Sequence, residues 1–95
     1  MLAVTSFDEP GYAVELANAT DYGLIAAVWT RDIARAHRLA RDLQCGQVYV
    51  NTFGAGGGVE LAFGGYKQSG HGREKGFEGL LTYTRTKTVV VRLDA

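Results

Sequence analysis

Residues 24–51 have the sequence LIAAVWTRDIARAHRLARDLQCGQVYVN, and this stretch decides the fold. Its two ends, 24–30 and 47–51, are short and rich in β-branched and aromatic residues, which predicts two strands. Between the strands, apolar residues recur at helical spacing, at Ile33, Ala36, Leu39, Ala40 and Leu43. A strand, a helix and a second strand in this order favour an α/β fold that contains a parallel strand pair.

Polar residues and a glycine indicate where the central helix begins and ends. Thr30 or Asp32 can cap its first turn, and Gly46 is placed to end it as a glycine just beyond the last turn. Upstream, the acidic pair before Pro10 predicts the start of another helix. Residues 2–7 are apolar and predict a short strand. The expected order is therefore strand, helix, strand, helix, strand.

The second half of the chain combines a glycine-rich loop with an apolar tail. We expect residues 52–72 to form a long loop, and loops of that length in compact domains are usually functional. A short helix around Phe77 follows. Residues 86–93 predict a final strand whose consecutive valines place apolar side chains on both faces. Such a strand needs cover on both sides, so we expect it to pair outside this segment, with a partner subunit as the economical candidate.

Composition excludes several classes of partner. The 10 basic and 10 acidic residues balance, so neither nucleic acid nor an anionic membrane is expected to bind. No apolar run approaches the roughly 20 residues of a membrane span, and the first residues do not resemble a signal peptide. The single cysteine, Cys45, allows no internal disulfide and fits a reducing compartment. We expect a soluble, cytoplasmic protein.

The residues that could take part in catalysis or binding do not form a complete site in this sequence. Cys45 lies near the end of a predicted helix, where the helix dipole disfavours a thiolate, so a structural role is expected. The glycines at 70, 72 and 76 miss the dinucleotide fingerprint by one residue. Neither histidine has a second ligand at metal spacing. We therefore expect no catalytic, cofactor-binding or metal residue here, while Arg73 and Glu74 are expected to pin the loop through backbone carbonyls.

Two segments resemble the last part of the aldehyde dehydrogenase superfamily. The first comprises YGL at 22–24, VWTRD at 28–32 and GQVYVN at 46–51. The second is ELAFGGYKQSGHGRE at 60–74, followed by YTRTKTV at 83–89. One departure is Ala62, which stands where the family often has proline.

The resemblance implies that residues 1–85 are the C-terminal portion of a catalytic domain and that 86–95 form an oligomerisation strand. In the full-length enzyme, an aldehyde is oxidised to a carboxylic acid by NAD or NADP through a cysteine thiohemiacetal. By the same resemblance, Phe63 and Phe53 lie in the substrate pocket, on the loop that walls its entrance.

We expect this chain to be inactive alone and to bind no cofactor itself. Its expected partners are the remainder of an aldehyde dehydrogenase subunit, or another copy of the chain through strand 86–93. The alternative is a standalone assembly module that docks by strand addition. A fragment with no function of its own is a third reading.

Overall fold

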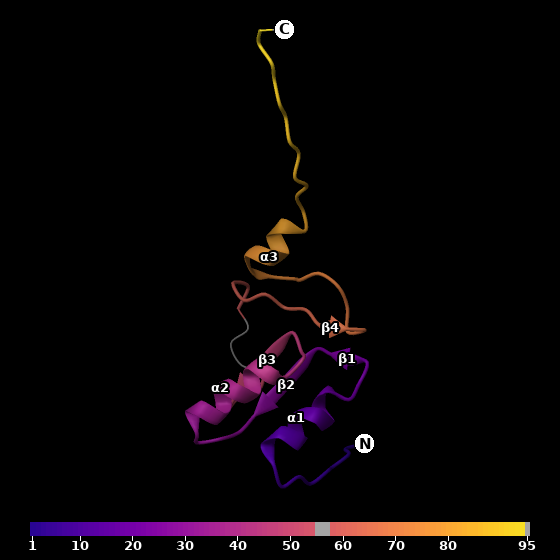
Figure 1. Cartoon of the computed structure of the whole chain (residues 1–95), viewed down its shortest axis with the longest axis vertical. Helices are drawn as coiled ribbons and strands as arrows, with labels where there is room; N and C mark the ends of the chain where they lie inside the picture. The colour runs from indigo at the N-terminus through magenta and orange to yellow at the C-terminus, as the bar shows by residue number, and fades with distance from the viewer. Residues whose placement is uncertain (55–57, 95) are drawn as a thin grey trace.

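The computed structural model describes residues 1–54 and 58–94. Three short helices are separated by pairs of short strands along the described chain (Figure 1). In chain order they are α1 (Pro10–Asn18), β1 (Tyr22–Gly23), β2 (Ile25–Val28), α2 (Ile33–Asp42), β3 (Gln47–Val50), β4 (Tyr66–Lys67) and α3 (Gly76–Leu81).

The parallel pair of β2 and β3 is the centre of the fold. The register runs from Ile25 opposite Gln47 to Val28 opposite Val50, and α2 is the crossover between the strands. Asp32 is the residue that caps α2, because its side chain accepts a hydrogen bond from the Arg35 amide at 3.0 Å. The α/β arrangement predicted from residues 24–51 is therefore present.

A second, antiparallel pair attaches the glycine-rich loop to this unit. β1 pairs with β4, with Tyr22 opposite Lys67. The Lys67 ammonium then donates to the carbonyls of Asn18 and Thr20, at 2.8 and 2.9 Å, beyond the last turn of α1. Charge-assisted bonds of this kind stabilise the carboxyl end of a helix, where the last carbonyls have no partner within the helix. The predicted loop 52–72 thus contains a two-residue strand, β4, which the sequence pattern did not predict.

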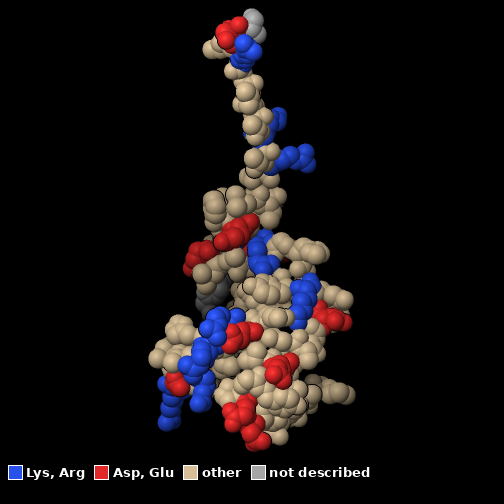
Figure 2. Space-filling model, viewed as in Figure 1, with Lys and Arg blue, Asp and Glu red and all other residues tan. Residues whose placement is uncertain are grey.

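The predicted strand at 2–7 is wrong, whereas the strand at 86–93 is expected to pair outside this chain and stays a prediction. Both segments lack strand pairing, and the tail runs away from the body (Figure 1). The physical reason is that a strand exists only through its ladder of hydrogen bonds, and no segment among the described residues offers one. In Figure 2 the tail is a thin column with no other part of the chain beside it.

Gly46 has a different role from the one predicted. The cap residue of α2 is Leu43 with φ −74°, so the helix does not end in a left-handed glycine. A Cβ at Gly46 would instead collide with the carbonyl oxygen of Gly64. Gly46 is therefore required because two backbones approach each other closely, at the point where the loop crosses the start of β3.

The chain has almost no core of its own. Among the described residues, Ala36 is the one buried apolar residue, and it is 3% exposed. The accessible surface is 8036 Å², against about 5,300 Å² expected for a folded monomer of 10.2 kDa. The radius of gyration is 18.9 Å, against about 12 Å for a compact domain of this length. Most apolar side chains of these elements are therefore without cover in the described chain.

We predict that Gly46→Ala destabilises the fold, because the new methyl group displaces the loop from β3. Overpacking of this kind costs about 1–3 kcal/mol, which lowers the unfolding temperature by roughly 4 °C or more at fixed chain concentration. The matched control is Gly11→Ala on α1, where a Cβ meets nothing within 4 Å. Equal unfolding temperatures for the two variants would contradict a structural role for the close approach.

Candidate functional site

The loop that carries Phe63 is closed at its base like a hairpin. Phe63 and Glu74 exchange two backbone hydrogen bonds, each 2.7 Å long. Outside this pair, the Gly76 amide donates to the Val59 carbonyl at 2.6 Å. These bonds hold residues 63–74 as one unit, so Phe63 is placed by its own backbone and not by a large core.

Arg73 stabilises the interior of that unit. Its Nη1 donates to the carbonyl oxygens of Gly65 and Gly72, at 3.0 and 2.7 Å. Its guanidinium also lies 5.6 Å from the centre of the Tyr66 ring, within cation–π range. The predicted pinning of the loop through backbone carbonyls is confirmed for Arg73. Glu74 contributes through its main chain, which pairs with Phe63.

Phe63 borders a cavity of about 300 Å³. The cavity lies between the loop and the start of the parallel pair, and is lined by Leu24, Phe63, Gly64, Gly65, Ser69, His71, Gly72, Arg73, Glu74 and Thr82. The Lys75 ammonium lies 6.0 Å from the centre of the Phe63 ring. The half-buried ring of Phe63 is thus an apolar wall with charged neighbours.

Phe53 lies beyond the end of β3, and a polar bridge connects it to the Phe63 loop. Its ring is 64% exposed and packs at 57° against Tyr49, with ring centres 5.8 Å apart. The Tyr49 hydroxyl donates to Gln47 Oε1 at 3.2 Å, and Gln47 Nε2 donates to the Ala62 carbonyl at 3.3 Å. Gln47 and Tyr49 were not identified from sequence, although alternate residues of one strand share a face.

Cys45 is placed in a setting that suppresses thiolate chemistry. Its Sγ donates to the Gln47 carbonyl at 3.2 Å, and burial raises the pKa of the thiol above its ordinary value. A nucleophilic cysteine needs the opposite shift, from a nearby cation or a helix amino terminus. The protonated Cys45 thiol, just before β3, is a hydrogen-bond donor and not a nucleophile.

The glycines of the loop do not form a dinucleotide site. Gly70 and Gly72 have φ angles of 131° and 71°, and a Cβ at either would meet nothing within 4 Å. They therefore serve a backbone conformation with positive φ. The helix that follows, α3, has only six residues. Gly70 and Gly72 thus do not open a long helix, as the glycines of a dinucleotide-binding turn do.

Other sites are also missing from the part of the chain that the structure describes. It contains no group of three or more His, Cys, Asp or Glu residues that could hold a metal ion. Likewise, none of its helices is both long enough and apolar enough to cross a membrane.

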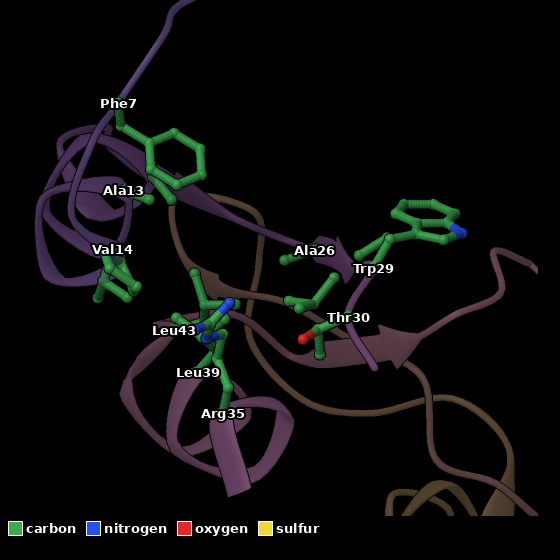
Figure 3. Close-up of a pocket in the computed structure, with 13 residues that line it drawn as sticks. Phe7, Ala13, Val14, Ala26, Trp29, Thr30, Arg35, Leu39 and Leu43 are labelled. Carbon is green, nitrogen blue, oxygen red and sulfur yellow. The ribbon is translucent and has the colours of Figure 1, made fainter. Parts of the chain in front are cut away.

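A second cavity, of about 310 Å³, lies between α1, α2 and β2 (Figure 3). Apolar side chains such as Val14, Leu39 and Leu43 line it, and Phe7 and Trp29 stand at its margins. Arg35 is its only charged lining residue. A groove of this composition lacks the convergent polar groups of a catalytic site and resembles a packing surface without its cover.

Among its described residues, the chain thus combines a parallel α/β unit with a closed loop that carries Phe63. Residues 1–89 match the aldehyde dehydrogenase family, and the chain belongs to it. The NADP/NAD-dependent aldehyde dehydrogenase PuuC of Escherichia coli is 48% identical over 95 residues, which is the whole of this chain and 19% of the relative.

Solved structures give the same result for the fold. A putative aldehyde dehydrogenase from Burkholderia cenocepacia is 60% identical, with a TM-score of 0.84 over 90% of this chain and 18% of that one. The NAD⁺ complex of aldehyde dehydrogenase from Bacillus cereus is 42% identical, with a TM-score of 0.86 over 92% of this chain and 18% of that one. The chain therefore spans about a fifth of the length of its relatives, and the predicted family and fold class are confirmed.

Proposed function

We propose that this chain is the C-terminal portion of the catalytic subunit of an NAD(P)-dependent aldehyde dehydrogenase, which oxidises aldehydes to carboxylic acids. The observation that carries the proposal is the family match over residues 1–89, together with the closed loop that presents Phe63. Within the subunit, 1–85 would complete the catalytic domain and 86–95 would be the oligomerisation strand. The nucleophile and the NAD or NADP site would lie outside this chain.

The same proposal makes the isolated chain inactive. Its only thiol, Cys45, has a raised pKa and is engaged with a backbone carbonyl. We also propose a cytoplasmic location, which is supported by this free thiol and by the absence of a cysteine partner for it.

A chimera tests the enzyme assignment directly. We replace the matching segment of the Escherichia coli relative with this chain and measure aldehyde-dependent formation of NADH and NADPH. We expect the chimera to retain activity within about tenfold of the parent, since the two segments are 48% identical over their full length. The parent without the segment, and the purified chain alone, should show none.

Two results would contradict the assignment. One is a soluble chimera that has the parent's oligomeric state and binds NAD⁺ but does not oxidise aldehydes. The other is aldehyde oxidation by the purified chain that disappears in Cys45→Ala.

We further propose that Phe63 and Phe53 form part of the aldehyde entrance. Support comes from the cavity beside Phe63 and from the Tyr49–Gln47 bridge, which ties both aromatic positions to one strand face. Large aromatic surfaces suit an apolar substrate channel, with a few polar groups at its edge.

For this entrance, we predict that Phe63→Ala and Phe53→Ala in the chimera raise the KM for an aromatic aldehyde by about tenfold or more. The reason is the loss of apolar contact, which is worth about 1–3 kcal/mol in a substrate pocket. Phe77→Ala on α3 is the control, because Phe77 is a similarly exposed phenylalanine outside the loop. If all three variants have the same KM, the entrance assignment is wrong.

The tail is proposed to add as a strand to another subunit. Residues 86–93 belong to no helix or strand of this chain, and Val89, Val90 and Val91 are all largely exposed, so both faces of the segment lack cover. The alternative role, a standalone assembly module, would use the same strand to dock on a copy of this chain or on a complete dehydrogenase.

We predict that Val89→Lys with Val91→Lys converts the oligomeric chain to a soluble monomer, because charged side chains at both positions oppose strand addition. Light scattering at matched concentrations measures the native mass. The control pair, Val89→Ile and Val91→Ile, preserves apolar β-branched side chains and should keep the oligomer. An oligomer that survives the lysine pair would exclude the tail as the interface.

A further inference from the structure

Asn51 extends the parallel strand pair with its side chain. The backbone ladder ends where the Asn51 amide donates to the Val28 carbonyl at 2.8 Å. Beyond it, Asn51 Oδ1 accepts from the Thr30 amide at 2.9 Å, and Asn51 Nδ2 donates to the Thr30 carbonyl at 2.9 Å. A side-chain amide has the same donor and acceptor as a peptide group, so it adds one more rung between β2 and β3.

At the same residue the main chain changes direction. Asn51 has φ 56°, in the left-handed region that asparagine tolerates better than most residues with a Cβ. The strand therefore cannot continue along its side of the sheet, while the side chain keeps the contact with Thr30. Two residues later, Phe53 packs against Tyr49, which lies back on β3.

This junction lies at the carboxyl end of two parallel strands. In open α/β sheets, ligands bind beyond that end, on the loops that leave the strands. The direction in which residues 52 and 53 leave β3 thus determines where an aromatic wall can stand. Among the described residues, the contacts that set this direction are the two amide bonds to Thr30 and the ring contact of Phe53 with Tyr49.

We propose that Asn51 is a positioning residue for substrate choice: its side-chain amide fixes the exit of the chain from β3 and thereby holds Phe53 at the aldehyde entrance. The inference rests on the proposed function, because it assigns Phe53 to the substrate wall. Asn51 acts through Phe53 and does not touch the reacting atoms. Its effect is therefore on the binding of large aldehydes and not on the chemistry of small ones.

Substitution by glycine separates the two features of Asn51. Asn51→Gly keeps the left-handed backbone accessible but removes both amide bonds to Thr30. In the chimera, we expect kcat/KM for an aromatic aldehyde to fall about tenfold or more, mainly through KM. For a two-carbon aldehyde, which is too small to reach Phe53, we expect kcat/KM to stay within about twofold of the parent.

Substitution by aspartate removes only one of the two bonds. Asn51→Asp keeps an acceptor for the Thr30 amide but turns a carboxylate oxygen toward the Thr30 carbonyl, where Asn51 has a donor. An exposed aspartate has a pKa of about 3.9, so the carboxylate stays ionised at neutral pH and the loss for the aromatic aldehyde should remain.

Steady-state kinetics with both aldehydes at neutral pH distinguish the outcomes. Selective loss for the aromatic aldehyde in both Asn51→Gly and Asn51→Asp supports the inference. Equal losses for both aldehydes, or no loss in either variant, overturn it while the active parent chimera leaves the proposed function standing. An inactive parent chimera overturns the proposed function and this inference with it.

Discussion

The parallel pairing of β2 with β3 is the constraint on which the rest of this structure depends. Parallel strands cannot be joined by a tight turn, so α2 must cross over between them. The loop then reaches β3 at two places, through the close approach of Gly46 to Gly64 and through the bond from Gln47 to Ala62. The position of the Phe63 loop relative to the sheet is therefore set by the strand pair.

The same pairing also explains why so much apolar surface of the chain is exposed. A parallel sheet is normally covered on both faces, yet here a two-stranded sheet is covered by only a few short elements. Ala36 is the one buried apolar residue among the described residues, and large apolar side chains from Phe7 to Leu93 face solvent. The polar network around the loop gives these elements their geometry, but it cannot replace the missing apolar burial.

Sequence reasoning succeeded where periodicity is long enough to be distinctive. The alternation in residues 24–51 predicts β2, α2 and β3, and Pro10 marks the start of α1, because these elements follow from local pattern and capping. The pinning role of Arg73 was also accessible, since a cation among glycines has few partners other than backbone carbonyls.

What sequence reasoning missed depends on contacts between distant segments. The two-residue pairing of β1 with β4 leaves no pattern of its own. The sequence predicts Gly46 as a helix end because glycine is common after a helix, whereas its close contact with Gly64 is set only by the three-dimensional fold. The hydrogen bonds of Gln47 and Asn51 are not predictable from the sequence, because one amide side chain at a strand does not indicate which distant residue it bonds. The terminal segments have the composition of strands but no ladder.

We therefore infer that the fold of this chain is stabilised by apolar contacts with other chains or segments. The most direct test is the unfolding temperature of the purified chain, measured across a hundredfold range of concentration with its native mass determined in parallel. The account predicts an unfolding temperature that rises with concentration, because association between copies supplies the cover that a single copy lacks. A monomer that unfolds cooperatively, at a temperature independent of concentration, would contradict it.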